Sequence, residues 1–143
     1  MNALKRLYQD TIRRHAAEPV GFGKDIAETH RHELFNAQCG DRVDIKLRLA
    51  GETIEAAAFD GEGCAICMAS SSLLCTHLPG LERAAARRLH EDLLALLAGA
   101  DAADTAGPLA PLSGVSSYPS RVRCATLPWL AAQRALERDS GPA

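Results

Sequence analysis

The chain has 143 residues, of which 47% are hydrophobic and 24% are charged, and its net charge is −2. These proportions are typical of one globular domain, which we expect to span residues 1–143, and they exclude a fibre or a disordered chain. The 16 basic residues form no long block among the 18 acidic ones, which disfavours binding to nucleic-acid phosphates. No apolar stretch approaches the roughly 20 residues that cross a bilayer, so we expect no membrane interaction.

The first residues form an amphipathic pattern. Leu4, Leu7, Tyr8 and Ile12 recur at helical spacing, and we expect this stripe to pack on a core. A basic amphipathic start also occurs in mitochondrial presequences, but a first helix that packs on the core is the simpler interpretation. The segment lacks the apolar stretch of a secretory signal. We therefore expect a cytoplasmic protein with reduced thiols.

The middle of the chain alternates between apolar and polar residues, which predicts strands. Residues 43–49 alternate strictly, 50–52 supply a turn, and 53–60 form the return strand of an antiparallel hairpin. A weaker strand over 30–35 precedes the turn at 36–41. The sequence thus predicts three consecutive antiparallel strands.

Helical periodicity follows the strands. It predicts helices over 64–78 and 81–98, and a last helix over 125–138 that tolerates Pro128 because this proline lies in the first turn. The Ala-, Asp-, Gly-, Pro- and Ser-rich segment 99–120 is expected to be a loop insertion. The predicted fold class is α+β, with a small three-stranded antiparallel sheet and helices packed on one face.

Three of the five cysteines lie where predicted elements meet, and an odd number of cysteines argues against a closed disulfide framework. Cys39 lies in the turn between the first two strands, Cys64 at the mouth of a helix and Cys124 at the start of the last helix. Such junctions at one end of a small sheet can converge in space. Helix N-termini, together with Arg121 and Arg123, favour thiolate over thiol.

A carboxylate accompanies these thiols. With Asp41, the three cysteines make a tetrahedral set suited to zinc, and the same set could hold a transient iron–sulfur cluster. Cys67 forms a C-x2-C pair with Cys64, as in redox dithiols, but the thioredoxin-like βαβ pattern is missing, so a small core residue or an alternative ligand is favoured. Cys75 is interpreted as a buried helical hydrophobe.

Three ordered motifs surround these cysteines. Residues 36–41 (NAQCGD) correspond to Asn-Pro-x-Cys-Gly-Asp, 61–66 (GEGCAI) to Gly-x-Gly-Cys-x-Ile, and 121–129 (RVRCATLPW) to Arg-x-Arg/Lys-Cys-Ala-Thr-Leu-x-Trp. Together they resemble the U-type scaffold family of iron–sulfur cluster assembly, which comprises IscU, SufU and the NifU N-terminal domain. The resemblance spans nearly the whole chain and implies a SufE/NifU-like fold.

Within that family the sequence resembles the SufU branch. The Leu-Pro-Pro-Val-Lys chaperone motif of IscU is missing, and Arg123 stands where IscU has histidine. Residues 99–120 resemble the insertion typical of SufU. Two positions depart from the family pattern, since Ala37 replaces a proline and Cys67 replaces a residue that is usually serine.

The resemblance implies a site and a function. Cys39, Asp41, Cys64 and Cys124 would hold zinc, and Cys39, on a loop loosened by Gly40, would accept persulfide sulfur from a SufS-type cysteine desulfurase. A histidine of the desulfurase would take over a zinc position, and the sulfur would pass to downstream cluster-assembly proteins. Such a carrier resembles a zinc-dependent sulfurtransferase that stimulates the desulfurase. One alternative is a scaffold on which a [2Fe–2S] cluster is assembled and transferred to apoproteins; another is a structural zinc protein.

Overall fold

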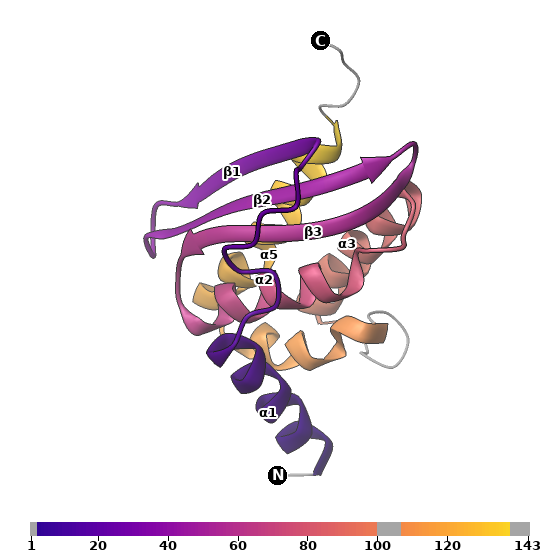
Figure 1. The fold of residues 1–143 in the computed structure, drawn as a ribbon. Coiled ribbons are helices and arrows are strands. Elements are labelled where there is room, and N and C mark those ends of the chain that lie inside the picture. Colours follow the sequence, from indigo (N-terminus) through magenta and orange to yellow (C-terminus); the bar gives the residue numbers. More distant parts are fainter. Residues whose placement is uncertain (1–2, 100–106, 138–143) are drawn as a thin grey trace.

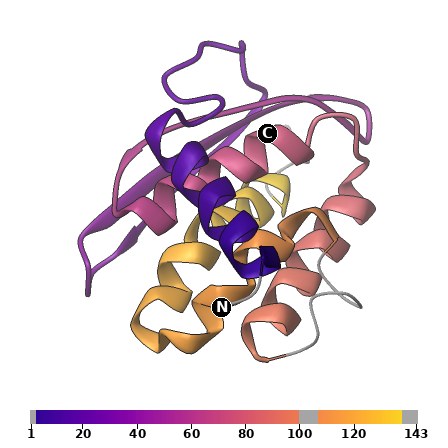
Figure 2. The same cartoon turned by 90° about the horizontal axis from the view of Figure 1, so that it is seen from below.

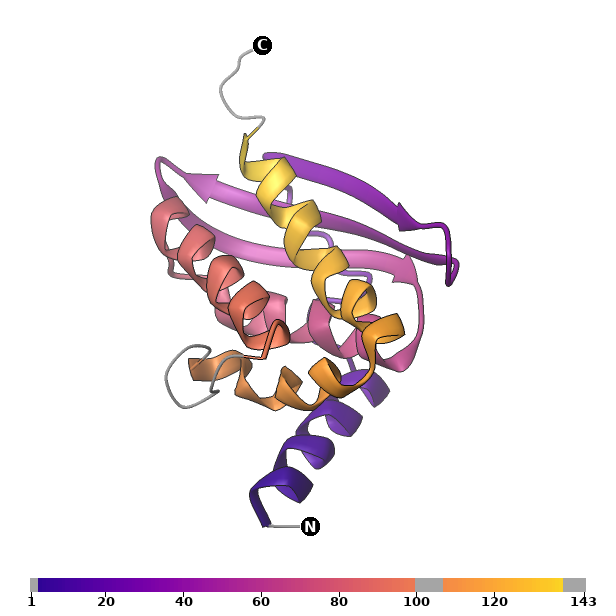
Figure 3. The ribbon, with the colours of Figure 1, turned by 180° about the vertical axis from the view of Figure 1, so that it is seen from behind.

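The computed structural model describes residues 3–99 and 107–137, and it has the predicted α+β architecture (Figure 1). A three-stranded sheet forms one layer, and helices lie on one of its faces (Figures 1 and 3). The elements in chain order are α1 (Ala3–Ala17), β1 (His30–Asn36), β2 (Asp41–Ala50), β3 (Thr53–Glu62), α2 (Ala65–His77), α3 (Arg83–Leu97), the 3-10 helix η1 (Gly107–Ser117) and α5 (Pro119–Glu137).

The sheet confirms the predicted antiparallel order β1-β2-β3. Its central strand buries Val43, Ile45 and Leu47 almost completely on the helix side, as the period-two pattern requires. At one end, Asn36 of β1 pairs with Asp41 of β2, so only four residues connect the two strands. This short connection carries the first cysteine motif.

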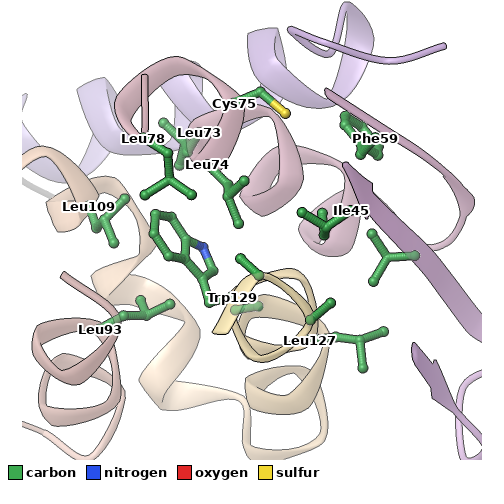
Figure 4. Close-up of a cluster of buried hydrophobic side chains, with 14 of the residues drawn as sticks. Ile45, Phe59, Leu73, Leu74, Cys75, Leu78, Leu93, Leu109, Leu127 and Trp129 are labelled. Carbon is green, nitrogen blue, oxygen red and sulfur yellow. The ribbon is translucent and has the colours of Figure 1, made fainter. Parts of the chain in front are cut away.

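Trp129 of α5 is the largest fully buried side chain. Figure 4 shows its indole among leucines that come from α2, α3 and η1. The indole N–H donates to the Ser70 hydroxyl at 3.0 Å, and that hydroxyl donates to the carbonyl of Ala125 at 2.6 Å. A buried hydrogen-bonded chain therefore joins α2, shortly after the second cysteine motif, to α5 within the third motif.

The expectation that the stripe of α1 packs on a core is confirmed for Ile12 only. No residue of α1 is buried, and Leu4 and Leu7 are each 54% exposed. Only Ile12, of the four stripe residues, packs against the hydrophobic core. The reason is position, because α1 lies at the end of the molecule away from the sheet, against α2 and η1 (Figures 1 and 3).

The predicted loop over 99–120 is wrong in its second half, while residues 100–106 lie outside the described part of the chain. Residues 107–117 form η1, which buries Leu109, Leu112 and Val115. These residues are three apart, and three residues per turn of a 3-10 helix place them on one face. The Pro- and Gly-rich composition concealed this period.

The last helix begins six residues before the expected start, at Pro119, where a proline suits the first helical position. Pro128 therefore lies in the helix interior, not in the first turn. Because proline has no N–H, the carbonyl of Cys124 receives no helical hydrogen bond from position 128. Neither this 19-residue helix nor any other described helix is long and apolar enough to cross a membrane.

We predict that Ser70→Ala lowers the free energy of unfolding by about 1–3 kcal/mol, because it leaves the buried indole N–H of Trp129 without its acceptor. Ser116→Ala is the matched control, since Ser116 is exposed and bonds only locally, to the carbonyl of Ser113. Urea unfolding of both variants checks the prediction. Equal stability of Ser70→Ala and the control would contradict it.

Candidate metal centre

Three of the predicted ligands meet at one end of the sheet. Cys39, Asp41 and Cys124 each offer one possible ligand atom, and these three atoms lie within 4.8 Å of one another. The two sulfur atoms are 3.5 Å apart. Cys39 comes from the β1–β2 connection, Asp41 is the first residue of β2, and Cys124 lies in the second turn of α5. The structure thus brings together segments 85 residues apart.

The β1–β2 connection is held by its own polar groups. The side-chain oxygen of Asn36 accepts a hydrogen bond from the N–H of Gln38 at 3.2 Å, and its carbonyl accepts one from the N–H of Gly40 at 2.8 Å. Gly40 has a φ of +78°, which favours glycine. The turn leaves Cys39 exposed to solvent. The expected mobility of this turn stays a prediction.

Asp41 is the buried polar centre of the site, with 2% of its surface exposed. Its Oδ1 accepts a hydrogen bond from the backbone N–H of Cys64 at 3.0 Å, and its Oδ2 lies 3.8 Å from the Cys64 sulfur. Burial alone would raise the pKa of Asp41, but hydrogen bonds from Cys124, Cys39 and Cys64 outweigh it and lower that pKa below the usual value.

Gly63 allows the Asp41 carboxylate to come this close to Cys64. A side chain at Gly63 would place its Cβ 3.0 Å from Oδ1 of Asp41 and 3.1 Å from the sulfur of Cys67. The glycine before the second cysteine therefore leaves room for the carboxylate. Cys64 itself is the N-cap of α2, as the sequence predicted. It lies beside the three-residue group, in contact with Asp41, and outside the 4.8 Å set.

The expectation that Cys124 lies at a helix start is wrong. α5 begins five residues earlier, and Cys124 is fully buried. Burial raises the pKa of the Cys124 thiol, and its hydrogen bond to Asp41 raises that pKa further. A helix N-terminus therefore does not ionise this thiol, and a bound cation is the group that would.

The remaining cysteines lie in the core. Cys67 is 1% exposed and Cys75 is 5% exposed, and both belong to the hydrophobic cluster. Burial raises the pKa of each thiol to about 12; for Cys67 the charge of Asp41 contributes in the same direction. The interpretation of Cys75 as packing is confirmed. Cys67, one helical turn after Cys64, does not belong to the 4.8 Å set.

The two arginines of the third motif differ. Arg121 interacts with Cys124 and Cys64, which raise the pKa of its guanidinium. Arg123 has an exposed side chain, and its carbonyl accepts a bond from the Thr126 hydroxyl at 3.4 Å. The sequence prediction treated the two alike. Because α5 begins at Pro119, Arg121 and Cys124 are three residues apart within one helix and lie on the same face. A helix predicted to start at 125 could not show this difference between the two arginines.

The donor atoms fit a zinc ion. Two sulfurs bound to tetrahedral zinc, with Zn–S bonds of about 2.3 Å, lie about 3.8 Å apart. The sulfurs of Cys39 and Cys124 are 3.5 Å apart, and a carboxylate with a lowered pKa lies beside them. Thiolates and a carboxylate are ligands that zinc accepts, and the Cys64 sulfur lies 3.8 Å from the same carboxylate.

The protein is thus an α+β fold in which two thiols and one carboxylate that could hold a metal ion meet at one end of the sheet. The family model for the NifU-like N-terminal domain matches residues 7–125. The chain belongs to this family, and to its group of iron–sulfur cluster assembly proteins.

Three relatives illustrate the similarity. The chain is 31% identical to the zinc-dependent sulfurtransferase SufU of Bacillus subtilis, over 96% of this chain and 95% of that protein. It is 29% identical to the iron–sulfur cluster assembly scaffold protein IscU of Streptococcus pyogenes, over 98% and 89%. A crystal structure of a putative scaffold protein for the SUF system from Fervidobacterium islandicum superposes with a TM-score of 0.81 at 26% identity, over 92% and 97%.

We predict that the five thiols of the chelator-treated protein differ widely in reactivity. Burial raises the pKa of Cys67 and Cys75 to about 12. Near neutral pH such a thiol is ionised about three thousand times less than a solvent-exposed cysteine with a pKa of about 8.5. Iodoacetamide should therefore label the exposed Cys39 first, as peptide mass spectrometry will show. In urea all five should react alike. Labelling of Cys67 as fast as Cys39 in the folded protein would contradict the prediction.

Proposed function

We propose that this protein is a zinc-bound sulfur acceptor that takes persulfide sulfur from a SufS-type cysteine desulfurase on Cys39 and passes it to cluster assembly. One observation carries the proposal. The exposed Cys39 thiol lies 3.5 Å from the buried Cys124 thiol and within the same set as Asp41. An exposed thiol thus lies beside two buried groups that could hold a metal ion with it.

The transfer is a thiol exchange on a persulfide. The thiolate of Cys39 attacks the outer sulfur of the donor persulfide, and a new S–S bond forms. The bond between the two donor sulfurs breaks, and the donor cysteine leaves as a thiolate that takes up a proton. Cys39 then carries the persulfide. The sulfur keeps its oxidation state, so the step needs no external oxidant or reductant.

The surroundings of Cys39 support its role as acceptor. It is exposed, whereas Cys124, Cys67 and Cys75 are buried, and Cys64 is half-buried. A donor persulfide on another protein can approach only an accessible sulfur. The four-residue turn between β1 and β2 presents Cys39 without support from a helix. The acceptor is thus placed where a partner surface can reach it.

The buried ligands have a different task. Zinc, when bound, keeps its thiolate ligands ionised without changing its own oxidation state. Asp41 holds the N-terminus of α2 through the Cys64 N–H, and Arg121 adds positive charge beside Cys124 and Cys64. These groups keep their thiols in place while Cys39 is modified. The similarity to a zinc-dependent sulfurtransferase of Bacillus subtilis supports this division of roles.

We predict that Cys39→Ala abolishes sulfur uptake from a SufS-type desulfurase, because Cys39 is the exposed thiol of the proposed ligand set, whereas Cys64 is half-buried and Cys124 is buried. Persulfide carried by the purified protein after incubation with desulfurase and cysteine is measured by mass spectrometry. Cys75→Ala is the control, and it should take up sulfur like the wild type. Stoichiometric transfer to Cys39→Ala would rule out the assigned acceptor.

We also predict about one zinc per chain in the purified protein, measured by elemental analysis. Asp41→Ala should lose most of this zinc, since a buried ligand and the support of the Cys64 N–H are removed together. Cys67→Ser should keep the zinc, because Cys67 is buried in the hydrophobic cluster, whereas Cys64 contacts the Asp41 carboxylate. Loss of zinc from Cys67→Ser with retention in Asp41→Ala would invert the proposed ligand set.

A [2Fe–2S] scaffold is the second candidate, and the similarity to two proteins named IscU favours it. The same thiols and carboxylate would then hold the cluster as cargo. Anaerobic reconstitution with iron and sulfide should in that case give a stable visible chromophore that a client apoprotein removes. Reconstitution that gives no such chromophore would leave the sulfur-acceptor function as the one supported.

A further inference from the structure

A groove of about 690 Å³ lies between α1 on one side and η1 with the start of α5 on the other. Figures 2 and 3 show these elements next to one another at the end of the molecule away from the sheet. Ala65 of α2 and Arg121 of α5 also line it. The apolar side chains that face one another across the groove are Leu4, Tyr8, Ile12, Pro111, Val115 and Tyr118.

The α1 wall of this groove is an incompletely buried apolar stripe. An amphipathic helix normally covers its apolar face, yet no residue of α1 is buried and Leu4 is 54% exposed. Across the groove, Tyr118 is 64% exposed. Two apolar surfaces therefore face a space that has the size of a typical ligand site. A further apolar element between them would complete the packing.

The charge of the groove indicates what that element is. α1 carries Lys5, Arg6, Arg13 and Arg14 against Asp10, although the whole chain has a net charge of −2. The described residues that line the groove include three cations, Lys5, Arg13 and Arg121, and no aspartate or glutamate. Arg13 also pairs with Asp10 at 2.9 Å, but both are exposed, and such a pair exchanges at little cost.

We propose that this groove binds an acidic amphipathic helix of a partner protein. The apolar face of the helix covers the stripe of α1, and its carboxylates pair with the three cations of the groove. A second copy of this chain is disfavoured, because it would bring two basic α1 helices together. A flat anionic membrane is disfavoured because the stripe faces a walled groove. The proposal does not depend on the sulfur-transfer function.

The position of the groove relates the partner to the metal centre. Arg121 lines the groove and also interacts with Cys124 and Cys64, and Ala65 directly follows Cys64. A helix in the groove therefore contacts residues next to Cys64 and Cys124, whereas Cys39 is not part of the groove lining. The partner therefore docks next to the thiol site.

The chain supplies its own reporters for a test. It has two tyrosines, Tyr8 and Tyr118, and both line the groove. Labelling with 3-fluorotyrosine gives fluorine NMR signals from this groove alone. The probe is a synthetic peptide as long as α1, 15 residues, with leucines at helical spacing and glutamates elsewhere. A peptide with lysines in place of the glutamates is the control. Both signals should shift saturably with the acidic peptide, and neither with the basic one.

Variants test the charges and the stripe separately. Lys5→Glu/Arg13→Glu should weaken binding about tenfold, because attraction at two lining positions becomes repulsion. The control Arg87→Glu/Arg134→Glu makes the same charge change at exposed positions outside the groove and should change binding less than about twofold.

The contribution of the apolar stripe is tested by one variant and one matched control. Leu4→Gln should weaken peptide binding, whereas Leu94→Gln, at a similarly exposed leucine of α3, should not. Circular dichroism confirms that the variants keep their helices; if Leu4→Gln loses α1, the charge variants still decide.

Three outcomes would overturn the proposal. The first is that neither fluorine signal shifts with the acidic peptide, or that the basic peptide shifts them equally. The second is a shift with phosphatidylglycerol vesicles alone, which would assign the surface to a membrane. The third is a shift that depends only on the concentration of the protein, which would assign it to a second copy.

Discussion

The site depends on one hydrogen bond, from the backbone N–H of Cys64 to the buried carboxylate of Asp41. It joins the first residue of β2 to the N-cap of α2, so a strand start and a helix start meet at one point. A buried carboxylate is costly unless donors surround it, and here the backbone N–H and the thiols supply them. Because Cys39 precedes Asp41 by two residues, this bond also fixes where the exposed thiol is presented. The α5 thiol completes the set from the other side, with Trp129 and Ser70 holding its helix against α2.

The five cysteines divide by burial and not by sequence spacing. Cys39 and Cys124 are 3.5 Å apart, yet one is exposed and the other fully buried. Cys67 follows Cys64 by one helical turn, but it points into the core. Burial raises the pKa of this thiol to about 12. Neighbouring sulfurs thus differ in their exposure to solvent, although they lie close together.

The sheet and α2 could be predicted from the sequence, because they depend on local alternation, short turns and helical periodicity. That the cysteine motifs converge could be expected because they lie where predicted elements meet. The prediction failed where tertiary packing overrides local pattern. The residues of η1 bury one face at a spacing of three within a Pro- and Gly-rich segment, which composition alone marked as a loop. Because α5 begins at Pro119, Cys124 lies in the core and not at a helix end, so the helix dipole does not stabilise its thiolate. The stripe of α1 was recognised, but only the fold shows that it borders a groove.

The central claim is that the metal is held by three thiolates and the Asp41 carboxylate, with Cys67 excluded. Zinc K-edge X-ray absorption of the purified protein and of Cys67→Ser tests it most directly. The account predicts three sulfur ligands at about 2.3 Å and one oxygen at about 2.0 Å in both proteins. Four sulfur ligands in the wild type that fall to three in Cys67→Ser would contradict it.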